Sequence, residues 1–341
     1  MHWLLKEHLE KCRLPYNNSQ RNDQTPTTRR CIVEETVDVQ EGQKSKATKL
    51  GVNALTLLAI SELLAATHDE ASLGDDADFF MDVARDLADF IQSAQHDDGS
   101  FVQKIQYYPT FKLDETFFVR YYQGEATFAL SRFYYVTGSV MELEPKQEWL
   151  DVAQAAAGYI IEKNWNVPDE EFVDDHWLLY GLAELHRCDS RRVGSRFVEF
   201  AMRTVHLVAQ SQYKEGDENR GQIRLDLKDW VGIHHESTSA TSTATKSEGL
   251  CAIFELAEDH RLGKEMAIIL DSAMDSVRYQ LKAQFGPELA MYMQDPLRVI
   301  GGLRQGIDSL LMRNDYTQHN LSSFLCLSKI LQTGHKDRFR Q

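Results

Sequence analysis

The chain has 341 residues, of which 43% are hydrophobic, and a formal net charge of -15. The acidic balance argues against a nucleic-acid partner, because such binding depends largely on Lys and Arg side chains that neutralise phosphates. No run approaches the roughly 20 apolar residues that a membrane helix requires, so we expect a soluble protein that binds neither nucleic acid nor membrane.

The first 45 residues predict a short amphipathic helix, MHWLLKEHLEKC, followed by a flexible loop. This segment contains acidic residues and lacks the apolar core of a secretory signal. The cysteines show no C-x-x-C spacing, and three of them lie in apolar helical runs; the five are Cys12, Cys31, Cys188, Cys251 and Cys326. We therefore predict a reduced, cytoplasmic protein with an N-terminal segment over 1–45 and one domain over 46–341.

From residue 46 onward, apolar helices alternate with two-faced helices in antiparallel pairs. The predicted helices span 46–67, 78–95, 122–136, 148–162, 174–186, 196–213, 242–259, 264–285 and 316–332. Short strand or loop segments are predicted in VQKIQYYPTF and MYMQDPLRVIGGL. The pattern predicts an all-α fold of five to six helical hairpins, with short β segments in the connecting loops.

Five of the predicted helices begin with a polar residue that leads into an apolar run. These residues are Asn53, Glu125, His176, Glu248 and His319, at intervals of 72, 51, 72 and 71 residues. Repetition at this scale suits a unit of one inner and one outer helix. If the inner helices stand around one axis, the five side chains gather at one mouth of a barrel, where we expect the chemistry.

Two passages resemble segments of helical toroids. QHDDGSF is a Gln-x-x-x-Gly-x-aromatic turn, and QGEATFALSRFYYVTGS opens with Gly-Glu-Ala before an apolar run. The sequence resembles the six-hairpin glycosidase-like superfamily, which includes glycoside hydrolases, polysaccharide lyases and sugar 2-epimerases. This resemblance implies an (α/α) toroid that acts on a saccharide or another polyhydroxylated small molecule. Toroids also serve as cyclases and scaffolds, so the fold alone leaves the function open.

The motif Asp174-Asp175-His176-Trp177 lies at a predicted helix start. One acidic residue of the pair is explained by capping the helix and by the helix dipole. The histidine supplies a proton-transfer group, and Trp177 supplies a flat face on which a sugar ring could stack. The motif is therefore a candidate for catalysis and substrate binding.

Glu125 follows Tyr121 and Tyr122 at another helix start. Desolvation at the mouth of a barrel would raise its pKa and allow it to act as a general acid, whereas the alternative is a first-turn carboxylate that satisfies the helix dipole. Its partner would be Asp174, Asp175 or Glu248.

A polar stretch from Arg313 to His319 comes directly before the last apolar helix. Asp315 suits a helix N-cap, but a cap does not explain Arg313, Tyr316 and His319. We therefore predict substrate binding by Arg313, Asp315 and Tyr316, and proton transfer by His319. The segment WVGIHHESTSATSTATKS contains a further candidate for substrate binding, His235. The Ser/Thr tract that follows predicts a loop, either at the surface or acting as a lid.

The sequence predicts no cofactor and no metal. Glu125, His176, Glu248 and His319 are acceptable ligand types, but groups on four helices around a toroid would stand too far apart for bonds of about 2 Å. Motifs for phosphate binding, zinc peptidases and serine hydrolases are also missing from the sequence.

These observations favour a glycoside hydrolase, in which Glu125 and either Asp174 or Asp175 act on a glycosidic bond. Tyr121, Tyr122 and Trp177 would stack on the sugar, and Arg313 with His319 would orient its hydroxyl groups.

Three alternatives remain open. In a sugar epimerase, His176 and His319 would exchange protons with a carbon next to a carbonyl. A polysaccharide lyase would enlist Asn53, His176, Arg313 and Tyr316, although the acidic charge weighs against a uronate polymer. The third alternative is a non-catalytic toroid that binds a glycan or a protein.

Overall fold

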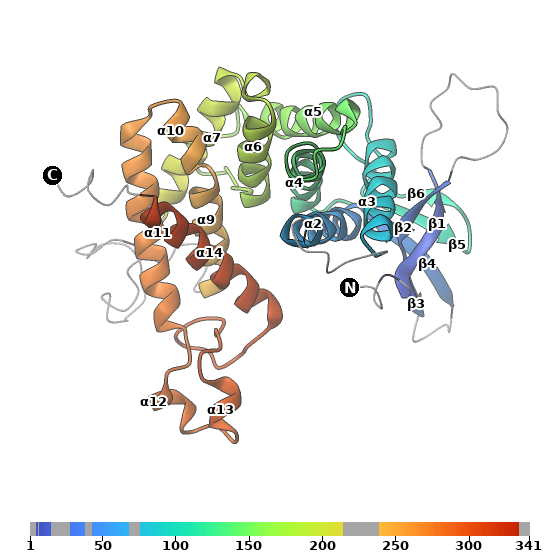
Figure 1. Cartoon of the computed structure of the whole chain (residues 1–341). Helices are drawn as coiled ribbons and strands as arrows, with labels where there is room; N and C mark the ends of the chain where they lie inside the picture. The colour runs from blue at the N-terminus through green and yellow to red at the C-terminus, as the bar shows by residue number, and fades with distance from the viewer. Residues whose placement is uncertain are drawn as a thin grey trace. The chain divides into compact units, whose positions relative to one another are not determined.

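A computed structural model of the chain describes residues 5, 7–14, 28–37, 43–67, 76–213 and 239–333. The chain divides into two compact units (Figure 1). Unit 1 comprises Met1–Pro168 and Tyr180–Phe197, and unit 2 comprises Asp169–Leu179 and Val198–Gln341. Each unit is described by itself.

Unit 1 contains six strands among its described residues, so the prediction of an all-α fold is wrong. Two strands form an antiparallel pair, and four form an antiparallel sheet in the order β3-β4-β5-β6. The strands are β1 (Leu9–Arg13), β2 (Thr28–Ile32), β3 (Glu34–Val37), β4 (Lys44–Lys49), β5 (Lys104–Tyr108) and β6 (Lys112–Leu113). The predicted amphipathic helix thus ends in β1, and the start of the helix predicted over 46–67 is the end of β4.

A disulfide between Cys12 and Cys31 links β1 to β2. Both cysteines are buried in an apolar cluster with Phe90 and Ile105, so the pair joins the hairpin to a helix and to β5. The prediction of reduced cysteines is wrong for these two, whereas Cys188, Cys251 and Cys326 are free.

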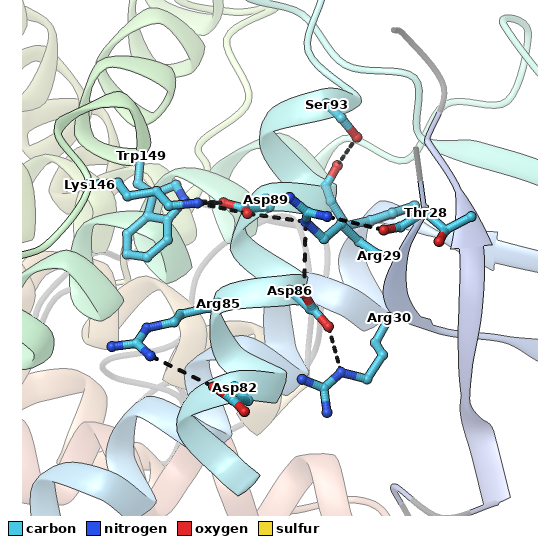
Figure 2. A network of polar contacts seen from close by, with 11 residues as sticks. Thr28, Arg29, Arg30, Asp82, Arg85, Asp86, Asp89, Ser93, Lys146 and Trp149 are labelled. Carbon is cyan, nitrogen blue, oxygen red and sulfur yellow. Dashed lines mark hydrogen bonds and ion pairs between the residues drawn. The ribbon is translucent and has the colours of Figure 1, made fainter. Parts of the chain in front are cut away.

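Ion pairs attach the same hairpin to the helices of unit 1. Figure 2 shows Arg29 and Arg30 reaching from β2 to Asp86 and Asp89 on α3 (Asp76–Ser93). Asp89 Oδ1 also accepts hydrogen bonds from Lys146 Nζ at 2.7 Å and, on α5 (Gln147–Asn164), from Trp149 Nε1 at 3.0 Å. We call these six residues, Arg29, Arg30, Asp86, Asp89, Lys146 and Trp149, the Asp86–Asp89 network.

The helical core of unit 1 is built on α2 (Leu50–Thr67), which packs against α3 and α4 (Tyr121–Tyr135). By length and composition α2 could cross a membrane, but 44% of it is buried inside the structure, and the core helix of a soluble protein passes the same test. The helix predictions for this region are confirmed to within a few residues, since apolar periodicity follows the buried faces.

Unit 2 is helical in its described residues. It takes the first turn of α6 (His176–Cys188) and the part of α7 (Ser195–Gln210) from Val198 onward. The other helices of unit 2 are α9 (Ala240–Ala252), α10 (Phe254–Asp259), α11 (Gly263–Lys282), α12 (Pro287–Ala290), α13 (Pro296–Val299) and α14 (Asn314–Gln332). Figure 1 shows α14, in red, running across α9 and α11, and the three helices pack on one another.

Two local predictions in unit 2 differ from the structure. The Ser/Thr tract is helical from Ala240, because Ser239 caps α9 by accepting a hydrogen bond from the backbone N–H of Thr241 at 3.2 Å. The segment MYMQDPLRVIGGL, predicted as strand and loop, contains the short helix α13, and its last residue, Leu303, forms an isolated β-bridge with Gln284.

Candidate functional site

Three helices of unit 2 bring His176, Glu248 and His319 together. His319 Nδ1 lies 3.0 Å from Glu248 Oε2, and His176 Nε2 lies 4.0 Å from the same oxygen. The two imidazole rings meet edge to face, with centroids 5.7 Å apart. His176 and Glu248 are only 7% and 2% exposed, so the group is largely shielded from water. We call these three residues the His–Glu–His cluster.

The approach of α6 to α9 depends on a glycine next to the glutamate. A Cβ placed on Gly249 would lie 3.1 Å from the Cβ of His176 and 3.0 Å from Cδ1 of Leu179, which is tighter than ordinary packing. The glycine therefore allows the first turn of α6 to rest against α9. On the other side, α9 meets α14 through a hydrogen bond of 2.8 Å from Ser323 Oγ to Ser247 Oγ.

Burial controls the charge of the cluster. Desolvation, with contributions from His319 and Lys246, lowers the pKa of His176 to about 3, so this imidazole is neutral at neutral pH. Desolvation also raises the pKa of Glu248, although hydrogen bonds from His319 and Ser322 oppose the shift. The cluster therefore holds a carboxyl group and at least one neutral imidazole in a low-dielectric site.

The two aspartates before His176 are engaged in other contacts. Asp175 Oδ1 accepts hydrogen bonds from the backbone N–H groups of Trp177 at 3.0 Å and Leu178 at 3.4 Å, so the capping interpretation holds for this residue. Asp174 forms an ion pair of 2.5 Å with the buried Lys246 on α9. Both carboxylates therefore serve contacts within the fold, which weighs against a role as glycosidase nucleophile or base.

The residues at the start of α14 divide between surface and interior. Arg313 and Asp315 are largely exposed and pair with each other at 3.0 Å, and α14 begins at Asn314 with Arg313 at the cap position. The prediction that Asp315 caps the helix is therefore wrong. Tyr316 is buried, one turn before His319, with Arg313 over its ring. The remaining candidate, His235, lies outside the described residues.

Unit 1 holds the other predicted residues, and one of them is structural. Asn53 Oδ1 accepts a hydrogen bond from the backbone N–H of Ile32 at 2.9 Å, and Nδ2 donates to Thr48 Oγ1 and to the Lys49 carbonyl, both at 2.7 Å. Asn53 thus joins α2 to the strands. Its polar atoms are committed to the fold.

Glu125 is buried on α4, and its Oε2 has no hydrogen-bond partner among the described residues. Desolvation raises its pKa to about 7. A Cβ on Gly51 would lie 2.6 Å from this oxygen, so the absent side chain leaves room for the carboxyl group against α2. Tyr122 lies beside it, and Tyr121 is more exposed and stacks under Arg120.

The donor atoms of the His–Glu–His cluster all lie within 4.8 Å of one another and could hold a metal ion. We predicted no metal from the sequence because ligands on separate helices of a toroid would stand too far apart. For these three residues the packing of α6, α9 and α14 brings the ligand atoms close together. The cluster can equally serve proton transfer, since one imidazole is already hydrogen-bonded to a carboxylate.

Sequence reasoning missed Lys246 and Gly249, which shape the cluster. The glycine inside an apolar helix was a readable sign of a close backbone approach. The Lys246 contact with Asp174 joins residues 72 positions apart and had no local signal. No model of a known protein family matches the sequence, and no curated protein matches it.

Proposed function

We propose that this protein is a carbohydrate-active enzyme that moves a proton at a carbon next to a sugar carbonyl, as in epimerisation. The single observation that supports this chemistry is the His–Glu–His cluster, in which His319 is hydrogen-bonded to Glu248 at 3.0 Å and faces His176. A base oriented by a second group is the usual arrangement for general base catalysis. The saccharide class rests on the resemblance of the sequence to the six-hairpin glycosidase-like superfamily.

In this mechanism His319 removes the proton, and Glu248 orients its ring and stabilises the imidazolium that forms. The electrons of the broken C–H bond move into the carbonyl to give an enediolate. His176, a neutral imidazole, passes its ring N–H proton to the opposite face of the carbon as a solvent water replaces that proton, and the hydroxide so formed takes up the proton held by His319. Because the atoms of the sugar are conserved, the reaction leaves its mass unchanged.

Hydrolysis of a glycosidic bond is the second candidate, and Glu125 is the observation that favours it. A buried carboxyl group with its pKa raised to about 7 suits a general acid at neutral pH. The cap on Asp175 and the ion pair of Asp174 weigh against these residues as its partner. We therefore place hydrolysis second.

A panel of monosaccharides and oligosaccharides, incubated with the full chain in D₂O and read by mass spectrometry and NMR, tests the proposal. Epimerisation predicts an isomer that carries deuterium at the inverted carbon. Gain of water would indicate hydrolysis, and an unsaturated product would indicate a lyase. No conversion of any sugar would contradict the enzyme proposal and favour a binding protein.

A matched pair of variants links the activity to the cluster. His319→Asn should abolish the exchange of deuterium, whereas His206→Gln should leave it unchanged. His206 is a suitable control because it also lies in unit 2 and pairs with a glutamate, Glu265, at 3.4 Å. Equal loss in both variants would contradict a catalytic role for the cluster.

We also propose a cytoplasmic location, because Cys188, Cys251 and Cys326 are free thiols, as is usual in a reducing compartment. The Cys12–Cys31 disulfide weighs against it, because disulfides are rare in reducing compartments. Alkylation of free thiols at the moment of cell lysis, followed by peptide mass spectrometry, decides the point. Alkylated Cys12 and Cys31 support the cytoplasm, and a protected pair contradicts it.

A further inference from the structure

We propose that His176, Glu248 and His319 bind a divalent transition metal ion of the zinc class. The inference goes beyond the proposed function, since it concerns a ligand of the protein itself and holds whether or not a sugar is the substrate. It rests on the chemistry of the three donor groups, on their spacing and on the charges around them.

The donor set selects the class of metal. Two imidazole nitrogens and one carboxylate oxygen suit zinc and its neighbours in the first transition row. Calcium takes six to eight oxygen ligands and magnesium keeps several waters, so a site with one carboxylate is poor for both. Three protein ligands also leave one position of a tetrahedron for water or a substrate oxygen.

The spacing requires only side-chain adjustment. Donors around a tetrahedral ion with bonds of about 2.0 Å stand ~3.3 Å apart. The two distances from Glu248 Oε2 are 3.0 Å and 4.0 Å, and no pair of donors exceeds 4.8 Å. The widest pair therefore has to close by about 1.5 Å, which rotation of two imidazole side chains can provide.

The charges around the cluster also bear on metal binding. Lys246 is a fixed cation whose charge acts on His176, and its pairing with Asp174 at 2.5 Å offsets part of that charge. Glu248 then contributes the negative charge that compensates part of the charge of the ion. The burial of Glu248 and His176 strengthens this attraction, because little water screens it.

A bound ion would disturb the proposed proton transfer. It would replace the contact between His319 Nδ1 and Glu248 Oε2, through which the carboxylate orients the base. We therefore expect added Zn²⁺ to suppress the epimerase activity, and a chelator to restore it.

Calorimetric titration of Zn²⁺ into the full chain, made without a histidine tag and stripped with a chelator, tests the site. We expect one ion per chain. The affinity for Zn²⁺ should be at least about 100-fold weaker in Glu248→Gln and in His319→Ala, because losing a residue that binds the metal costs more affinity than losing a residue that only hydrogen-bonds to such a ligand. His206→Gln should bind as the unchanged protein does, and Mg²⁺ should not bind. Thermal melting of each metal-free variant shows whether it is folded. If a variant is unfolded, His319→Asn is titrated with Zn²⁺ in its place.

The outcomes separate this inference from the proposed function. Absence of Zn²⁺ binding, or equal binding by the folded Glu248 and His319 variants, would overturn the metal site. The sugar panel, run on the stripped protein, stands independently of that result. Sugar conversion without Zn²⁺ binding would leave the proposed function intact, and Zn²⁺ binding without sugar conversion in the stripped or loaded protein would overturn the function alone.

Discussion

The Asp86–Asp89 network of unit 1 and the His–Glu–His cluster of unit 2 both gather ionisable side chains from three elements, but they are satisfied in different ways. In the network each aspartate meets arginine or lysine, and Asp89 also accepts a hydrogen bond from Trp149 (Figure 2). In the cluster a buried carboxyl group meets two imidazoles. The aspartates of the network are neutralised by arginine and lysine, and they stabilise the fold. The donor atoms of the His–Glu–His cluster are not paired with arginine or lysine in this way, and they can accept a proton or a metal ion.

The largest effect that we expect is a loss of activity, without a comparable loss of stability, in a variant of the His–Glu–His cluster. His319→Asn should lower kcat by about 10²- to 10⁴-fold, the usual contribution of a general base, and lower the free energy of unfolding by no more than about 1 kcal/mol. Deuterium exchange into the sugar and urea denaturation measure the two quantities. A large loss of stability would place the cluster with the network as a structural feature.

Unlike Asp86 and Asp89, Glu125 is a buried carboxyl group of unit 1 that has no cation paired with it among the described residues. Its pKa is raised from 4.5 to about 7, so the folded protein holds the proton more tightly than the unfolded chain. The resulting stabilisation is present below pH 4.5 and is lost as the pH rises through 7.

Glu125→Gln should therefore gain stability relative to the unchanged protein, by about 3 kcal/mol, between pH 4 and pH 8. Urea denaturation at several pH values measures the difference. A constant difference over this range would show that Glu125 titrates alike in the folded and unfolded chain.

Substitutions in the Asp86–Asp89 network should lower the free energy of unfolding. Asp89→Ala removes the shared partner of Arg29, Lys146 and Trp149, and we expect a loss of about 2 kcal/mol in the free energy of unfolding. Asp82→Ala, on the same helix but in an exposed pair with Arg85, should change it by less than about 0.5 kcal/mol. Equal effects of the two substitutions would contradict a special role for Asp89.

Gly249→Ala tests how closely the cluster depends on helix packing. The new methyl group must push His176 by a few tenths of an ångström, and we expect Zn²⁺ affinity to fall about tenfold with a loss of about 1 kcal/mol in stability. Alanine at Gly263, where a Cβ meets nothing within 4 Å, is the control. Unchanged affinity in Gly249→Ala would show that the spacing of α6 and α9 does not position the donors.

Part of the fold could be predicted from the sequence. Apolar periodicity located the helices, because each buries one continuous face. The strand predicted in VQKIQYYPTF is confirmed as β5. The strands β1 to β4 were missed because they are short and charged, and because their partners are distant in the chain: Lys46 on β4 pairs with Glu10 on β1 and with Glu35 on β3. The Cys12–Cys31 pairing likewise depends on strand register that no local pattern encodes.

For the site, the position of polar residues at helix starts selected His176, Glu248 and His319, which the structure brings together. The same rule selected Asn53, whose polar atoms serve the strands instead. His176 is the first residue of α6, whereas Glu248 lies in the second half of α9, so the grouping of these side chains depends on tertiary packing and not on helix starts. The gathering of Glu125 with the cluster stays a prediction.

A crystal structure of the protein with Zn²⁺, with anomalous scattering recorded at the zinc edge, tests the metal site most directly. We predict one strong peak about 2 Å from a nitrogen of His176, a carboxylate oxygen of Glu248 and a nitrogen of His319. A cluster without a peak at saturating Zn²⁺, or three side chains that point away from one another, would contradict the claim that these helices build one shared chemical site.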